Sequence, residues 1–173
     1  TANPTDAQIT TALTGTGLTI SAPVLVSGSR SQQIATFTNG IAGAGLKIDK
    51  GVMFSTGNVT QNLTNKNSAT FQSDNPSGNY SDPDLTAITG AARYNPAVYR
   101  FTVTLGLTTT AIRLSYQFAS EEYPDYVGSA FNDAFGFFVT GPGITGTANM
   151  ARLPSNNKVT TINNINAGVQ GFS

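Results

Sequence analysis

The sequence predicts a mainly β protein, an antiparallel, jelly-roll-like β-sandwich with one or two short helices. Two observations carry this prediction. The first is that only 10% of the residues are charged, so that the polar residues are mainly threonine, asparagine, serine and glycine. The second is that several short segments alternate apolar and polar residues. β-branched residues favour strands, whereas Asn and Gly favour the turns between them. A chain of 173 residues fits one domain over residues 1–173.

The first part of the chain predicts one helix followed by strands. Thr5 and Gln8 have the spacing of a capping box, which predicts a helix through Leu13 that ends at Thr14-Gly15. Short β-branched segments bounded by Gly, Ser and Pro then predict strands. These strands are Leu18–Ala22, Val24–Val26, Gln33–Thr38 and a strand running into a turn over Val52–Gly57. Between them, Gly40–Gly45 is expected to be a glycine-rich loop.

The second part predicts one more helix and the clearest strands. Pro83 at a first helical position, after Ser81 or Asp82 as cap, predicts a helix within Asp82–Ala92. Tyr99–Leu105 and Ile112–Phe118 both alternate apolar and polar residues, and the short Gly106–Thr110 between them predicts an antiparallel hairpin. The continuous apolar run Phe135–Thr140 predicts a strand buried on both faces.

Composition excludes several classes of function. Nine basic and nine acidic residues form no run of one sign, so nucleic acid is not an expected partner. No apolar stretch reaches the length of a membrane span, and the N-terminus reads as already processed. Histidine and cysteine are both absent, which removes the usual general base, the usual nucleophile pairs and the usual zinc ligands.

Six of the nine acidic residues lie in two short windows. Like charges this close need a cation or buried donors to compensate them, and oxygen ligands suit Ca²⁺. The predicted Ca²⁺ ligands are Asp82, Asp84, Glu121, Glu122, Asn132 and Asp133. In the alternative interpretation these acids cap turns and helices or pair with arginines, which requires no metal. The arginines concerned are Arg93, Arg100 and Arg113.

A pair of carboxylates also suggests glycoside hydrolysis, which needs two acids on either side of one sugar bond. Glu121 and Glu122 would point to opposite faces of a strand, so only Glu121 with Asp133 could form such a pair. We do not expect an enzyme. Tyr123, Asp125 and Tyr126 stand in an expected loop and are the predicted ligand-contacting residues, while the phenylalanines are assigned to the core.

Two neighbouring segments resemble a known family. Phe118–Val127 reads FASEEYPDYV and Phe131–Phe138 reads FNDAFGFF, which together resemble the signature of the choice-of-anchor L bacterial surface domains. Three further segments are similar to elements of that family, so that the resemblance extends from about Leu13 onward. They are Gly51–Gly57, the DPDL element Asp82–Leu85, and Gly141–Asn166 with its paired asparagines.

The resemblance implies a secreted bacterial domain at the cell surface, placed beside varied anchoring signals, with an adhesive rather than a catalytic role. The family's SEEY and ND residues correspond to Glu121, Glu122, Asn132 and Asp133. Family domains usually continue with further strands beyond the paired asparagines, whereas this sequence stops at Ser173. Two interpretations follow: the sequence is a fragment, or incompletely assigned, and lacks the C-terminal strands of the family, or the domain leaves a sheet edge open.

Two functions follow as expectations. The first is a non-enzymatic extracellular module for adhesion or ligand binding, stabilised by Ca²⁺. The alternative is a structural subunit of an extracellular homopolymeric fibre, a filament of the kind that supports a biofilm, assembled from neighbouring copies by β-strand complementation.

Overall fold

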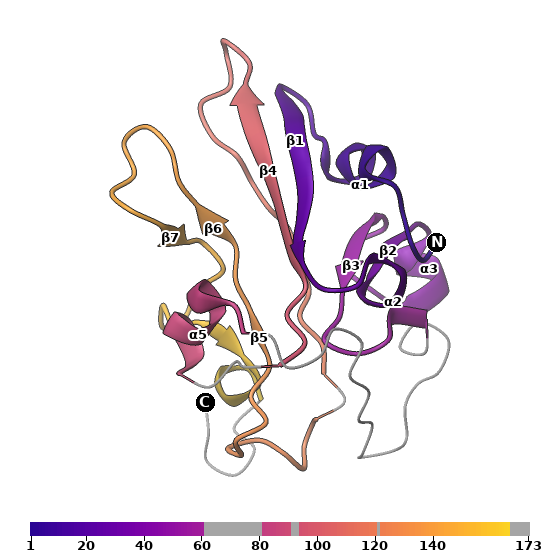
Figure 1. The fold of residues 1–173 in the computed structure, drawn as a ribbon, viewed down its shortest axis with the longest axis vertical. Coiled ribbons are helices and arrows are strands. Elements are labelled where there is room, and N and C mark those ends of the chain that lie inside the picture. Colours follow the sequence, from indigo (N-terminus) through magenta and orange to yellow (C-terminus); the bar gives the residue numbers. More distant parts are fainter. Residues whose placement is uncertain (61–80, 91–93, 121, 167–173) are drawn as a thin grey trace. The chain divides into compact units, whose positions relative to one another are not determined.

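The computed structural model describes residues 1–60, 81–90, 94–120 and 122–166 (Figure 1). These residues divide into two compact units. Unit 1 takes in the described residues of Thr1–Lys66 and Asn95–Gln117, and unit 2 those of Asn79–Tyr94 and Phe118–Ser173. The prediction of a single domain stays a prediction.

The elements with described bounds in unit 1 are three short helices and two antiparallel strand pairs. Its elements are α1 (Asp6–Leu13), β1 (Leu18–Ser27), α2 (Arg30–Gln33), β2 (Ile34–Phe37), α3 (Gly40–Ala44), β3 (Gly51–Phe54) and β4 (Val98–Leu105). β1 pairs with β4, and β2 pairs with β3. In Figure 1 the long β1 and β4 ribbons run side by side.

The capping box of α1 is confirmed. The Thr5 amide donates to Gln8 Oε1 over 2.8 Å, and the Gln8 amide donates to Thr5 Oγ1 over 3.2 Å. The helix ends at the predicted place, with Thr14 as its C-cap. Ile9 is fully buried and anchors the helix, which lies against β1 and β3.

The two strands predicted at 18–22 and 24–26 are one strand, β1. A register shift between Ser21 and Val24 forms a bulge at Ala22, whose φ is 48°. A bulge of this kind absorbs an extra residue and accommodates Pro23, which cannot donate to a ladder. The strand therefore continues through the residues that the sequence had indicated as a turn.

The predicted hairpin of Tyr99–Leu105 with Ile112–Phe118 is wrong. β4 pairs instead with β1, with Leu18 opposite Leu105, and Ile112–Phe118 belongs to none of the described strands. The turn after β4 bonds to the chain just before β1: the Gly106 amide and the Thr109 hydroxyl both donate to the Gly17 carbonyl, over 2.8 and 2.7 Å. These bonds favour the distant partner over the local one.

The core of unit 1 lies around β2, where Ile34 and Ala35 are fully buried. Gln33 is also fully buried, and it ends α2 rather than beginning the predicted strand. The predicted loop at Gly40–Gly45 is a short helix, α3, closed by Gly45 in the left-handed region at φ 67°. A side chain at Gly40 would meet the Ile48 carbonyl, so glycine permits this close approach.

Unit 2 contains one α-helix, a 3₁₀ turn and two pairs of two-residue strands among its described residues. They are α5 (Pro83–Thr89), β5 (Ala134–Phe135), β6 (Phe138–Val139), β7 (Ala148–Asn149), β8 (Thr160–Thr161) and η1 (Ile162–Asn164). β5 pairs with β8 and β6 with β7, both antiparallel. Val127, Ala151 and Ile162 form the buried apolar core.

The predicted single strand over Phe135–Thr140 is two short strands with different partners. The break falls at Gly136, where an added side chain would collide with the ring of Phe138. Glycine at position 136 therefore leaves room for the Phe138 ring at the point where the chain changes partner between β5 and β6.

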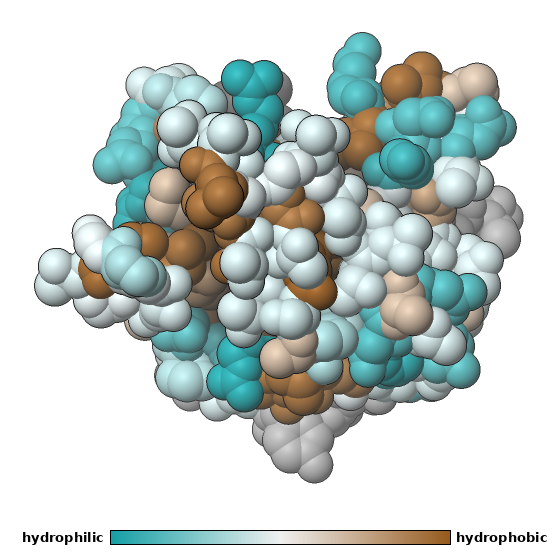
Figure 2. Space-filling view, turned by 90° about the horizontal axis from the view of Figure 1, so that it is seen from above, coloured by the Kyte–Doolittle hydropathy of each residue, from teal (hydrophilic) through white to brown (hydrophobic). Residues whose placement is uncertain are grey.

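The described part of the chain is thus mixed, with short antiparallel strands in four two-stranded sheets and few helices. A sandwich of two facing sheets is not confirmed. Figure 2 shows one face of the molecule, on which hydrophobic side chains reach the surface in several separate places among polar ones.

Candidate functional site

The helix α5 carries the first acidic window. The Asp82 carboxylate caps it, with Oδ1 accepting from the Leu85 amide over 3.0 Å, and Pro83 follows as predicted. Asp84 lies in the first helical turn and is exposed. One oxygen of Asp82 is therefore used by the backbone, as the capping interpretation predicts, and this bond leaves its second oxygen available for other ligands.

The second acidic window begins in a series of turns over residues 122–130, and Asp133 follows these turns. The Tyr126 amide donates to the Glu122 carbonyl over 2.9 Å, and the Ser129 amide donates to the Tyr126 carbonyl over 3.0 Å. Val127 is 2% exposed and fixes the segment to the core of unit 2. Asp125 is exposed, whereas Glu121 lies outside the described residues.

Two asparagines connect this turn segment to the rest of unit 2. The Gly128 amide donates to Asn163 Oδ1 over 2.6 Å, and the Asn163 amide donates to Asn132 Oδ1 over 3.0 Å. The Ile162 amide also donates to the Asp133 carbonyl over 3.2 Å. Asn132, predicted as a metal ligand, here orders the backbone of a segment 31 residues away.

Sequence reasoning missed this role of Asn132 and the participation of Asn163. The available signal was that Asn132 stands in the FND element and Asn163 in the paired asparagines, two segments of the same resemblance. No local rule joins an asparagine to a backbone amide that is distant in sequence. The hydrogen bond from the Asn163 amide to Asn132 Oδ1 joins these two segments directly.

The two acidic windows approach each other within unit 2, because α5 contacts β5, which begins directly after Asp133. Figure 1 shows α5 and β5 close together. Even so, among the described residues no group of three or more carboxylates gathers in the way a metal site requires. The Ca²⁺ site stays a prediction.

The predicted ligand-contacting residues differ in their surroundings. Tyr126 packs edge-on against Phe131, with ring centroids 5.6 Å apart and an interplanar angle of 84°. Phe131 is 64% exposed, so its assignment to the core is wrong. Tyr123 has a buried hydroxyl with no hydrogen-bond partner among the described residues, and this burial raises its pKa above the ordinary value. Asp125 and Phe131 are the outward-facing residues of this group.

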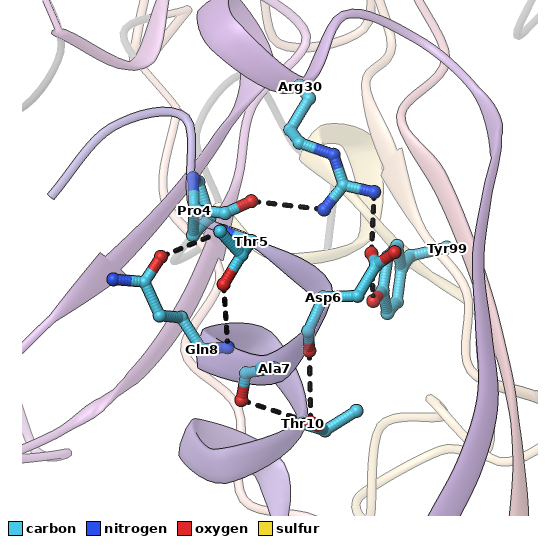
Figure 3. Close-up of polar contacts among 8 residues, drawn as sticks. All are labelled: Pro4, Thr5, Asp6, Ala7, Gln8, Thr10, Arg30 and Tyr99. Carbon is cyan, nitrogen blue, oxygen red and sulfur yellow. Dashed lines mark hydrogen bonds and ion pairs between the residues drawn. The ribbon is translucent and has the colours of Figure 1, made fainter.

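Unit 1 contains a charged network that the sequence did not indicate (Figure 3). Arg30 contacts Asp6 Oδ1 at 2.5 Å and donates to the Pro4 carbonyl over 3.0 Å. The Tyr99 hydroxyl donates to the same Asp6 oxygen over 2.8 Å, and the Arg30 guanidinium lies 5.9 Å from the centre of the Tyr99 ring. The network joins α1, α2 and β4.

These contacts change the acidity of both groups. The hydrogen bond from Tyr99, and then that from Arg30, lowers the pKa of Asp6 below 3.8. Burial, and then the bond to Asp6, raises the pKa of Tyr99 to about 12. Near neutral pH the network therefore holds an ionised carboxylate and a protonated phenol, the states that make its hydrogen bonds. Its position among three elements indicates a structural role.

The fold and the site together define a small module of short antiparallel strands, whose acidic and aromatic residues stand in turns ordered by asparagines. Within the described residues, no helix is long and apolar enough to cross a membrane. The chain belongs to the Choice-of-anchor L domain family, whose model matches residues 2–173. It is accordingly a bacterial surface-associated module, of a family not known for catalysis. No curated protein and no solved structure matches the chain.

Proposed function

We propose that this domain is a non-enzymatic extracellular adhesion module that binds its ligand through the turn segment of unit 2. The observation that carries this proposal is the Tyr126–Phe131 pair, in which one ring supports another that is 64% exposed. An exposed aromatic face suits a carbohydrate or a peptide, and Asp125, which precedes Tyr126 in the sequence, adds an exposed carboxylate to the same segment.

The asparagine bonds support the proposal because they fix the backbone beneath this surface. Asn163 accepts from Gly128 in the turn, and Asn132 directly follows Phe131. A surface that is ordered before binding loses less conformational entropy when the ligand arrives. Ca²⁺ bound by the neighbouring acids would order the same turns further.

A glycan and peptide microarray, probed with the labelled domain, tests this function. Phe131→Ala should remove binding to any spot that the unchanged domain recognises. Tyr94→Ala is the matched control, since Tyr94 is an aromatic residue of unit 2 with a similar exposure of 65%. Equal binding by both variants would contradict the assignment of the site, and no binding to any spot would count against adhesion through glycans or peptides.

A second function, a structural subunit of an extracellular fibre, is favoured by a different observation. The described strands of unit 1 form two-stranded sheets, and Ile112–Phe118 has a strand-like sequence but joins neither sheet. Such segments pair readily with another chain. Electron microscopy of negatively stained protein at rising concentration would show filaments if this function is correct and discrete particles if it is not.

A further inference from the structure

The segment Ala111–Gln117 follows the turn after β4, and each of its residues is exposed. We name it the open segment. Its apolar residues alternate with polar ones, and Ile112 and Leu114 are 49% and 38% exposed. Within the described part of the chain, the backbone of residues 112–115 makes no hydrogen bond. A strand-like sequence gains stability on pairing when part of its backbone, here residues 112–115, makes no hydrogen bond and its apolar side chains lie in solvent.

The two units carry opposite charge, which the neutral total conceals. The described residues of unit 1 contain five basic and two acidic side chains, a net charge of +3. Those of unit 2 contain two basic and five acidic side chains, a net charge of −3. Contact between the same unit of two copies would be repulsive, whereas contact between unit 1 of one copy and unit 2 of another would be attractive.

Exposed charges of opposite sign are available on the two units. Arg113 stands within the open segment, and Arg100 is exposed on β4. In unit 2, Asp84 and Asp125 are exposed. Charge complementarity therefore selects unit 2 of a second copy as the partner of the open segment, rather than another unit 1.

We propose that the open segment of one copy adds as a strand to unit 2 of the next copy. This contact is heterologous, because different surfaces meet, and repeating it produces an open chain of copies rather than a closed dimer. The inference rests on the second function proposed above and names the surface that would perform it. Backbone hydrogen bonds between the strands supply the affinity, and the opposite charges determine that unit 1 of one copy meets unit 2 of the next.

The experiment compares two charge reversals in the full chain by sedimentation velocity and negative-stain microscopy over a range of concentrations. Arg113→Glu and Arg152→Glu change the net charge of the chain equally, and both arginines are exposed, but Arg113 belongs to unit 1 and Arg152 to unit 2. Arg113→Glu should weaken association at least about tenfold, or about 1.4 kcal/mol. Arg152→Glu should leave association unchanged or strengthen it.

Two further measurements separate strand pairing from charge alone. Leu114→Pro removes a backbone donor from a stretch that makes no backbone bond in the described structure, so it should abolish assembly while circular dichroism and the unfolding transition stay the same. Salt at about 1 M, where the Debye length is about 3 Å, should weaken the assembly of the unchanged chain.

The outcomes distinguish the surface from the function. Filaments that form equally well with Arg113→Glu and Leu114→Pro would overturn this surface and leave the fibre function standing. A chain that remains monomeric at every concentration would overturn both. Equal weakening by Arg113→Glu and Arg152→Glu would show that net charge, rather than the direction of contact, governs association, and would overturn the head-to-tail arrangement.

Discussion

The Tyr99 hydroxyl donates a hydrogen bond to Asp6 across 93 residues of sequence, and so connects the first helix of unit 1 to β4. Arg30 contacts the same carboxylate oxygen from α2. A single acceptor therefore fixes three elements that are distant in the chain. Removing the Asp6 carboxylate should therefore lower the stability of unit 1 and leave ligand binding unchanged.

Tyr99→Phe should lower the free energy of unfolding by about 1 kcal/mol, because it removes one hydrogen bond to a charged group. The effect is kept modest by solvent, since the Asp6 side chain is 43% exposed. Urea denaturation followed by circular dichroism measures the change. Tyr94→Phe, on a tyrosine that is 65% exposed, should change nothing, and an equal loss in both variants would contradict the role of the bond.

The same network predicts stability losses at both ends of the pH scale. The pKa of Asp6 is lowered in the folded state, so its contribution is present above 3.8 and is lost as the pH falls through the folded value. The pKa of Tyr99 is raised from 10.0 to about 12, so its contribution is present below pH 10 and is lost as the pH rises toward 12. Thermal unfolding across pH should show that Asp6→Asn flattens the acid limb. A Tyr99→Phe variant whose alkaline limb matches that of the unchanged chain would contradict the second assignment.

Gln33→Leu should be strongly destabilising, by about 2 to 4 kcal/mol. The fully buried Gln33 amide donates to the Ser55 and Asn95 carbonyls over 3.1 and 2.9 Å, and its oxygen accepts from the Ser29 amide over 2.8 Å. Leucine would remove the Gln33 partner from each of these three partly buried backbone groups. Gln32→Leu is the control, because Gln32 is exposed, and denaturant midpoints compare the two.

Asn163→Ala should loosen the turn segment of unit 2, because the Gly128 amide loses its acceptor. Hydrogen exchange measured by mass spectrometry should show faster exchange in peptides covering residues 122–130. Asn156→Ala removes a comparable bond, from the Lys158 amide to Asn156 Oδ1 over 3.0 Å, but within a local turn. Exchange in 122–130 that rises equally in both variants, or in neither, would show that Asn163 does not hold the segment.

Gly136→Ala should cost about 1 to 3 kcal/mol, because the added methyl group collides with the Phe138 ring and forces the packing to shift. Gly141→Ala provides the control, since a side chain there meets nothing within 4 Å. Differential scanning fluorimetry of the two variants gives the comparison. A Gly136→Ala variant as stable as the control would mean that β5 and β6 adapt without strain.

Ca²⁺ should raise the melting temperature if the acids of unit 2 bind it, by an amount equivalent to about 2.7 kcal/mol at a hundredfold excess over the dissociation constant. Asp133→Asn should reduce this gain, whereas Asp49→Asn, which changes an acid of unit 1, should not. An unchanged melting temperature on addition of Ca²⁺ and on chelation would remove Ca²⁺ from the proposed function.

The starts of the helices could be predicted from the sequence, whereas the partner of strand β4 could not. The capping box of Thr5 and Gln8 and the Asp82-Pro83 start of α5 depend on residues a few positions apart, so a short window contains the whole cause. The partner of β4 depends on a strand near the N-terminus, and the alternation of Ile112–Phe118 indicates a strand without saying whether one forms. Periodicity alone therefore favoured the nearer partner.

The candidate site shows the same division. Asp82, Glu122 and Asp125 could be selected from their clustering, whereas the exposure of Phe131 and the bonds of Asn132 depend on the packing of η1 and the turns. A phenylalanine in an apolar signature is assigned to a core because most are buried. The aromatic support from Tyr126 gives this one a partner while it stays in solvent.

The pairing of β1 with β4 also has a consequence for the order in which the chain can fold as it emerges. Leu18 is opposite Leu105, so β1 has no partner strand until the chain has been synthesised to about residue 105. Closing so long a stretch of chain is slow compared with forming a local hairpin. Until then unit 1 cannot complete its longest strand pair, however early its N-terminal helix α1 forms.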